Sequence, residues 1–240
     1  MSRALAAVLA LLQWFAGAAL VANAQDAKPA ITAAVSVPQV TFSFDRPGLP
    51  VPKYRLTIQE DGATVYEGEA VWQGSGSTSV SPPQPFRSAV KISPATAGRI
   101  IAMGRQLNHF NINCSTKAKN IANTGTKVLS YSAPDGSGSC TYNYSDNKDV
   151  ESLTETIQGI AETLDRGREL DHLHRFDRLG LDSAIIFLSQ EVTEGHALEL
   201  GTIVVSLRSI ASDPELIERV RNRAGKLLAL IPGEAPLVKP

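Results

Sequence analysis

Downstream of Ala24 the sequence lacks any apolar run long enough to cross a bilayer, so a membrane span is not expected there. An excess of either charge is also lacking, because the 240 residues carry 23 basic and 24 acidic side chains, a formal net charge of −1. Without a basic excess, the chain has no electrostatic footprint for nucleic acid. We therefore expect a protein that binds no nucleic acid and has no membrane span after residue 24.

Several catalytic motifs are absent as well. The serine-rich stretches GSGSTSVS and DGSGS do not contain the GxSxG pattern of a nucleophilic serine. Their glycines are not followed by Lys-Ser or Lys-Thr, as a phosphate-binding loop requires. Both stretches are typical of loops and turns, and nothing in the sequence indicates a cofactor.

The first residues, MSRALAAVLALLQWFAGAALVANAQ, have the pattern of a signal peptide. Arg3 precedes a long apolar run, and Ala22 and Ala24 occupy the small-residue positions before a cut at Gln25. We expect residues 1–24 to be removed and the protein to be secreted or periplasmic. The run is long for a signal peptide, so an uncleaved membrane anchor is the alternative.

Only two cysteines are present, Cys114 and Cys140, and neither belongs to a CxxC pair or has a nearby histidine. A zinc site is therefore disfavoured. In an oxidising compartment the two would form a disulfide closing a loop of about 25 residues, which stabilises the fold by on the order of 3 kcal/mol. Two free thiols are the alternative.

Alternating apolar and polar residues predict strands in the first half of the chain. The stretch YRLTIQEDGATVYEGEA, residues 54–70, alternates on both sides of an EDG turn and predicts a β-hairpin. The same period predicts a strand over Phe86–Ile92 and a second hairpin from residues 126–132 and 140–145. The stretch that begins at Thr41 is a further strand candidate.

Helical signals begin at Ser93-Pro94, where Ser can cap the backbone and Pro suits the first helical position. From Asp149 onward apolar residues recur at steps of three and four, and no strand signal follows. The first helix there extends as far as Leu179 unless Gly167 interrupts it. The residues that set this rhythm are Val150, Leu153, Ile157, Ile160 and Leu164.

Three more helices are expected after Gly180. Asp182 is the predicted cap of one that ends near Gly195, and the next covers residues 197–211. Asp213-Pro214 opens the last, which directs Leu216, Ile217, Val220, Leu227 and Leu228 toward the core.

The sequence thus predicts an α+β fold with a small antiparallel sheet packed by helices, in the order strand pair, strand, helix, strand pair, followed by an all-α region. The expected divisions are a signal peptide (1–24), an extended tether (25–40), a sheet domain (41–148), a helical domain (149–232) and a tail (233–240). The two halves differ in charge: residues 25–150 carry 12 basic and 9 acidic side chains, and residues 151–240 carry 10 and 15.

The hairpin pattern Y-x-L-x-I-x-x-D-G-x-x-x-Y-x-G over residues 54–68 resembles domains of unknown function in secreted bacterial proteins. The later segments NTGTK (123–127), YNYS (142–145) and LHRFDRLGLD (173–182) look like an uncharacterised bacterial family that covers most of the chain. The resemblance implies an exported α+β protein with this order of elements. It implies no active residue to carry over.

The densest titratable group is Asp171, His172, His174 and Asp177. On a helix, His174 lies one turn from both Asp171 and Asp177, so either carboxylate could orient its imidazole for metal binding or acid–base chemistry. His172 points elsewhere and cannot share a metal with His174. Surface ion pairs or a packing histidine are the favoured interpretation of this group.

The five tyrosines, at positions 54, 66, 131, 142 and 144, all lie in predicted strands. We expect them to cover the core and pair across strands rather than to stack on a ligand. The opposite face of the sheet then becomes the best candidate contact surface. It includes Arg55, Thr57, Gln59 and Asn143.

No group of residues converges on a recognisable reaction, so the favoured function is an exported, non-catalytic binding or interaction module of the cell envelope. Its expected partner is a protein or a glycan of the envelope. The alternative is a hydrolase or metal-dependent enzyme that uses His174 with Asp171 or Asp177.

Overall fold

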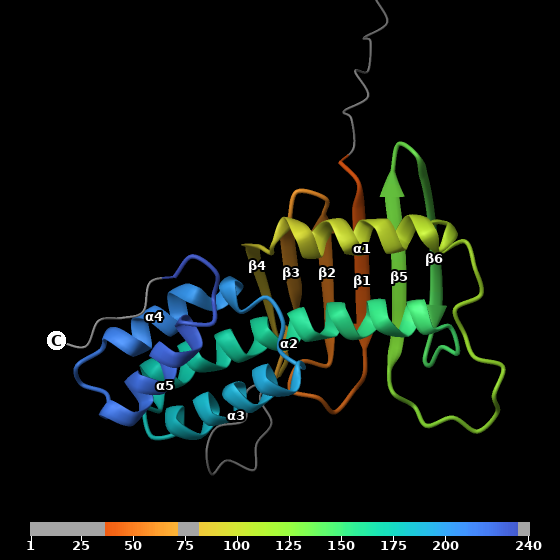
Figure 1. Ribbon diagram of the computed structural model, residues 1–240. Helices are drawn as coiled ribbons and strands as arrows, with labels where there is room; N and C mark the ends of the chain where they lie inside the picture. Colours follow the sequence, from red (N-terminus) through yellow and green to blue (C-terminus); the bar gives the residue numbers. More distant parts are fainter. Residues whose placement is uncertain (1–36, 72–81, 235–240) are drawn as a thin grey trace, which may run out of the picture. The chain divides into compact units, whose positions relative to one another are not determined.

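The computed structural model describes residues 37–71 and 82–234. Within these ranges six antiparallel strands form one sheet in the order β4-β3-β2-β1-β5-β6 (Figure 1). Strands come first and a helical region follows, so the predicted α+β class is confirmed. The strands are β1 (Gln39–Asp45), β2 (Lys53–Gln59), β3 (Ala63–Ala70), β4 (Gln84–Lys91), β5 (Thr126–Ala133) and β6 (Gly136–Tyr142).

The predicted hairpin over residues 54–70 is β2 and β3, with Leu56 opposite Tyr66. The candidate strand at Thr41 is β1, which begins at Gln39 and pairs with both β2 and β5. It adds a fourth strand before the first helix to the predicted order. The predicted signal peptide, residues 25–36 of the tether, residues 72–81 of the loop and residues 235–240 of the tail lie outside the described residues.

Two helices, α1 and α2, lie across one face of the sheet, and α3, α4 and α5 continue beyond its β4 end (Figure 1). In the described parts of the chain, no helix has both the length and the apolar character needed to cross a membrane. The helices are α1 (Pro94–Gln106), α2 (Lys148–Phe176), α3 (Leu181–Glu194), α4 (Val204–Ser212) and α5 (Glu218–Leu228), with 3₁₀ turns η1 (Asn108–Phe110) and η2 (Leu200–Ile203).

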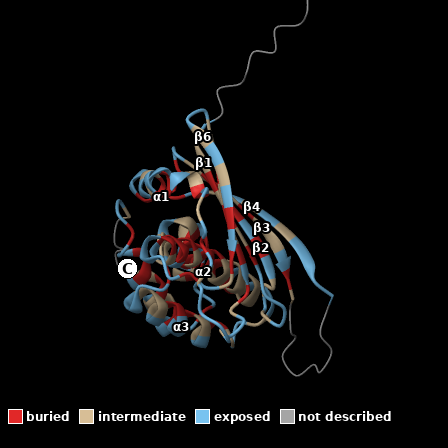
Figure 2. Ribbon diagram, turned by 90° about the vertical axis from the view of Figure 1, so that its right-hand side faces the viewer, coloured by how far each residue is buried: buried red, intermediate tan, exposed pale blue. Residues whose placement is uncertain are grey.

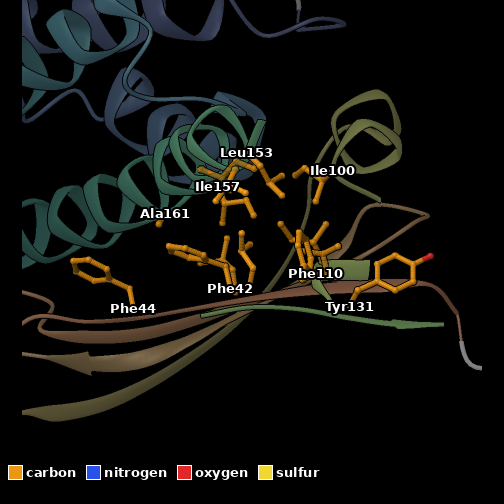
Figure 3. Packing of buried hydrophobic residues seen from close by; sticks show 14 of the residues in the cluster. Phe42, Phe44, Ile100, Phe110, Tyr131, Leu153, Ile157 and Ala161 are labelled. Atoms are coloured by element: carbon orange, nitrogen blue, oxygen red, sulfur yellow. The ribbon is translucent and has the colours of Figure 1, made fainter. Parts of the chain in front are cut away.

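The main core fills the space between the sheet and the helices α1 and α2 (Figure 3). Every second residue of β1 points inward, so Val40, Phe42 and Phe44 are buried while their neighbours are not. Ile100 of α1 and Ile157 of α2 close the layer from above. The apolar face of the strands, which repeats every second residue, thus packs against the apolar faces of the helices, which repeat every 3.6 residues.

A second core lies in the helical region, and α2 belongs to both cores. Its residues up to Leu164 pack on the sheet, whereas Leu170 packs against α3, α4 and α5. Gly167 does not interrupt this helix, which ends at Phe176 rather than Leu179. The 29 residues of α2 therefore connect the sheet to the helical region without a hinge.

Small residues on α2 let the segment after α3 pack directly against the helix. The backbone N–H of Leu198 donates to the Gly159 carbonyl at 3.0 Å, and the Thr163 hydroxyl donates to the Leu198 carbonyl at 2.6 Å. A methyl group at Gly167 would lie 2.3 Å from Cγ2 of Ile203. Gly159, Thr163 and Gly167 are spaced four residues apart, so they form one stripe along the helix.

This packing overturns the prediction of one helix over residues 197–211. The chain first follows α2, passes Glu199 in a left-handed conformation (φ 57°), and begins α4 only at Val204. The Glu199 carboxylate accepts hydrogen bonds from the backbone N–H and the hydroxyl of Ser93, both at 2.7 Å. Ser93 in turn caps α1, as predicted, by accepting from the Thr96 N–H at 3.2 Å.

Two other helix starts differ from the prediction. Gly180, not Asp182, is the N-cap of α3, and Asp182 forms ion pairs with Arg219 and Arg223 of α5 instead. The last helix begins at Glu218 rather than at Asp213-Pro214. Ile217 precedes it and is 52% exposed, so its predicted place in the core is wrong.

The disulfide between Cys114 and Cys140 is present, as predicted. It ties the segment after η1 to β6, the outermost strand on that side. The Asn111 side-chain amide donates to the Ser137 carbonyl at 2.9 Å, and the Ser115 hydroxyl donates to the Thr141 carbonyl at 3.0 Å. The segment therefore covers backbone groups of β6 that an edge strand would otherwise present.

Replacing Gly167 by Ala is expected to lower the free energy of unfolding by about 1–3 kcal/mol, because the new methyl group overlaps the buried, branched Ile203. Gly225→Ala in α5 is the matched control, since nothing lies within 4 Å of its added methyl group. The control should gain about 0.5–1 kcal/mol from helix propensity. Urea unfolding of both variants checks this, and equal shifts in the two would contradict the packing described for α2.

Removing the disulfide with Cys114→Ser and Cys140→Ser together should lower the free energy of unfolding by about 3 kcal/mol, because the open chain gains entropy when the loop between the cysteines is released. Urea unfolding of the double variant, of the oxidised protein and of the protein in dithiothreitol measures the effect. The reduced protein and the double variant should coincide. Midpoints equal to that of the oxidised protein would show that the bond contributes no stability.

Candidate functional site

The face of the sheet opposite α1 and α2 is not covered by any described element (Figure 2). We call it the open face. The side chains that point to it are all half-buried or exposed, whereas the residues with which they alternate in β1, β2, β3 and β5 are mostly buried. Its central residues are Thr41 and Ser43 of β1, Arg55, Thr57 and Gln59 of β2, Val65 and Glu67 of β3, and Val128 and Ser130 of β5.

A hollow of about 560 Å³ lies at one end of the open face. Five of the six strands contribute to its wall, so the hollow depends on the whole width of the sheet from β4 to β5. Its size falls within the range of sites for small molecules or for a protruding side chain of a partner. The open-face residues that line it are Ser43, Asp45, Lys53, Arg55, Glu67, Glu69, Pro85, Arg87, Thr126 and Val128.

Strand register arranges the charges of this hollow in two rows of alternating sign. In one row Lys53 lies between Asp45 and Glu69. In the other, Glu67 lies between Arg55 and Arg87 and forms an ion pair with each, at 3.8 Å from Arg55. Exposed pairs of this kind add little stability, so they are free to exchange partners with a charged ligand.

Three of the four predicted contact residues lie on the open face. Arg55 lines the hollow and donates to the Ser43 hydroxyl at 3.3 Å. Thr57 and Gln59 follow it along β2, and the Thr57 hydroxyl is 3.4 Å from that of Thr41. Asn143 does not share this surface: it lies beyond the end of β6, and its side chain binds the backbone of Ala122 and Thr124.

The tyrosines lie mainly on the other side of the sheet, as predicted. Tyr54, Tyr66, Tyr131 and Tyr142 are buried in the main core, and only Tyr144, past the end of β6, is exposed, at 41%. Tyr54 and Tyr66 pack edge to face, with ring centroids 5.7 Å apart. Among the described strand residues whose side chains alternate toward the open face there is consequently no aromatic residue. The hollow is also lined by Phe44, Tyr54 and Phe86, which alternate toward the other side of the sheet.

His174 is held by a carboxylate that its spacing in the sequence did not indicate. Its Nε2 lies 2.8 Å from a carboxylate oxygen of Asp213, the residue that ends α4. This contact lowers the pKa of Asp213. Asp177 instead accepts a hydrogen bond from the backbone N–H of Gly180 at 3.2 Å, and Asp171 is exposed.

The His174–Asp213 pair joins the end of α2 to the end of α4, and both side chains are largely buried, 17% and 16% exposed. A histidine oriented by a carboxylate is one part of an acid–base site. Neither of the two hollows described for this structure includes His174. The pair therefore acts as a tertiary contact between two helices, and the predicted enzymatic alternative gains no support from it.

One other group has the composition of a metal site. Glu191, Glu194 and His196 each offer a ligand atom within 4.8 Å of the others, at the C-terminal end of α3. Nδ1 of His196 lies 3.4 Å from both carboxylates. His196 and Glu194 are about 60% exposed (63% and 60%), so these contacts are those of a solvated surface cluster and we assign no metal to it.

A half-buried carboxyl group, Asp165 with 22% of its side chain exposed, lies at the interface of α2 and β3, and sequence analysis did not single it out. The Tyr66 hydroxyl donates to Asp165 at 2.8 Å, and Arg168 lies 3.2 Å from the same oxygen. Burial raises the pKa of Asp165 to about 6, and the hydrogen bond from Tyr66 and the charge of Arg168 only partly oppose this. Burial also raises the pKa of Tyr66, so this hydroxyl remains a donor.

No known protein family matches this sequence, and no curated protein matches it either. The resemblance of the hairpin and of the later segments to secreted bacterial proteins accordingly stays a prediction.

Because Asp165 has a higher pKa in the folded state than in the unfolded state, the folded state binds more protons between about pH 4 and pH 6. The free energy of unfolding should therefore fall as the pH rises through this window, by on the order of 2–3 kcal/mol from this group. Asp165→Asn, which retains an acceptor for Tyr66, should lose this dependence. Urea unfolding at pH 4, 5, 6 and 7 measures it.

The matched control is Asp171→Asn, an exposed carboxyl group on the same helix, which should follow the wild-type profile. Three neighbours of Asp165 remain in every variant, namely Glu162, Arg168 and Tyr54. If Asp165→Asn and the wild type show the same profile from pH 4 to pH 7, the carboxyl group is not held in a water-poor environment.

Proposed function

We propose that this chain is an exported, non-catalytic binding module of the cell envelope and that its partner is a protein held on the open face. The observation that carries the proposal is the exposed sheet surface, toward which no aromatic residue of the described strands alternates, with its hollow of about 560 Å³. A sheet whose second face is left without helices is a common platform for a partner, because one face packs the core and the other stays solvated.

The chemistry of the open face favours a protein over a glycan. Within residues 37–71 and 82–234, a sugar would find no aromatic side chain that alternates toward this face, because the buried tyrosines point to the opposite side. The two rows of alternating charge offer both signs within one hollow, with Lys53, Arg55 and Arg87 set against three carboxylates. Complementary charges on a partner would fix its register and speed its association.

Export is supported by chemistry as well as by the leader sequence. The two cysteines of the chain form a disulfide, and disulfides persist in secreted and periplasmic proteins but are rare in the cytosol.

A pull-down from an envelope extract with the oxidised protein tests the proposal. A partner should be retained in a saturable manner, and Arg55→Ala with Arg87→Ala should weaken its affinity by about tenfold or more, because both guanidinium groups line the hollow. Arg175→Ala, which removes one guanidinium group at an exposed position on α2, is the control away from the hollow and should bind like the wild type. Titration of the purified partner by calorimetry gives the affinities.

Two results would contradict the proposal. The first is that no saturable partner is found in the extract. The second is that the double variant on the open face binds as tightly as the wild type, while a variant elsewhere on the surface loses binding.

A further inference from the structure

Two segments that the sequence analysis singled out, residues 123–127 and 142–145, meet on the helix side of the sheet. Strand register places Lys127 of β5 opposite Tyr142 of β6, and both side chains point toward α2. The N–H of Thr124 donates to the side-chain oxygen of Asn143 at 2.8 Å, and the Asn143 amide donates to the Ala122 carbonyl at 3.0 Å. These contacts fix the two segments to each other.

Within this frame Lys127 is a buried cation without an anionic partner. Only 7% of the residue is exposed, and its ammonium donates to the Thr124 hydroxyl at 3.0 Å and to the Asn143 carbonyl at 2.8 Å. None of the carboxylates in residues 37–71 and 82–234 lies within ion-pair distance of it. Burial lowers the pKa of Lys127, and the positive charge of Arg46 acts in the same direction.

Lys127 lines a hollow of about 160 Å³ between the ends of β5 and β6 and the first turns of α2. Since one water takes up about 30 Å³ in the liquid, the hollow suits a ligand of roughly five to seven non-hydrogen atoms. The Lys127 ammonium also lies 5.8 Å from the centroid of the Phe44 ring. An ammonium group has three N–H donors, and the two hydrogen bonds above leave one that no hydrogen-bond acceptor of the described residues takes.

The opposite wall of this hollow is acidic. Glu151 and Glu155 of α2 line it, and Glu155 is exposed, whereas Glu151 is half-buried and pairs with Lys148 at 3.1 Å. A simple anion would be attracted by Lys127 and repelled by both glutamates. A simple cation would meet the opposite conflict. Only a ligand with both charges satisfies the two walls at once.

We propose that this hollow binds a small zwitterion, such as a free amino acid, with its carboxylate on Lys127 and its ammonium group toward Glu151 and Glu155. The site is independent of the open face, because Lys127 and Tyr142 belong to the other side of the sheet. It can therefore fail while the proposed protein-binding surface stands, and the reverse holds as well.

Titration of the full, oxidised chain with L-alanine and with γ-aminobutyrate tests the site, because the two probes place their charges at different distances. Acetate and methylammonium, which carry one charge each, are the reference probes. Chemical-shift changes in NMR spectra should be saturable for at least one amino acid and should centre on Lys127, Asn143 and Glu155. Its affinity should exceed that of acetate and of methylammonium by about tenfold or more.

Two variants separate the walls of the site. Lys127→Met should abolish binding of the amino acid, since it removes the carboxylate partner. Glu151→Gln with Glu155→Gln changes only side chains near the surface, so folding is retained; it should weaken amino-acid binding about tenfold and strengthen acetate binding. Lys91→Met, at an exposed position of β4, is the matched control and should bind like the wild type.

The proposal is overturned if neither amino acid gives saturable shifts, or if acetate binds as tightly as the amino acids. It is also overturned if the double glutamate variant binds the amino acid with wild-type affinity. Should Lys127→Met fail to fold, the double glutamate variant and the comparison of probes still decide the matter.

Discussion

The close contact between α2 and the segment from His196 to Ile203 is the constraint on which the rest of the structure depends. Three small residues on α2 leave room for this segment, and the Thr163 hydroxyl binds its backbone. Because the segment lies against the helix, Glu199 reaches Ser93 and completes the cap of α1. One stripe on one helix thus fixes both the position of the helical region and the start of the helix that covers the sheet.

The two hydrophobic cores share α2 for the same reason. Leu164 packs on the sheet side and Leu170 on the side of α3 to α5, less than two turns apart. A rigid helix that belongs to both cores couples them, so a change in packing at one end of the helix affects the packing at the other end. The half-buried Asp165 lies at this junction and accepts a hydrogen bond from Tyr66 of the sheet. Its cost in desolvation is tolerated where the surrounding packing is tight.

Much of the fold follows from sequence periodicity, because burial of one face imposes a period of two on strands and of 3.6 on helices. The hairpin of β2 and β3, the strands β4 and β5 and the long helix α2 were predictable in this way. The strand predicted over residues 140–145 is displaced: β6 runs from Gly136 to Tyr142, because the hairpin turns tightly at Pro134-Asp135 with Ala133 opposite Gly136. The α4 region was not, because its start depends on contacts between the chain and Gly159 and Thr163 of α2, distant in sequence. Ile217 was wrongly expected in the core, because its exposure also depends on tertiary packing that the local sequence pattern does not show.

The candidate sites were predictable only in part. Alternation along β2 placed Arg55, Thr57 and Gln59 correctly on one face. Asn143 lies past the end of β6, where the alternation of side chains no longer holds. Lys127 has the same parity as the buried Leu129 and Tyr131, and this is the signal that identifies it in the sequence. The partner of His174 is Asp213, which follows another helix. A contact between residues so far apart in the sequence cannot be predicted from local spacing.

The disulfide has a second role that follows from where it lies. Cys140 is on the outermost strand, and the segment bonded to it shields that margin of the sheet with hydrogen bonds from Asn111 and Ser115. Oxidation thereby closes one side of the sheet to strand addition by a neighbouring chain. The covalent bond thus holds the covering segment at the margin of the sheet, so its hydrogen bonds to β6 do not have to keep it in place alone.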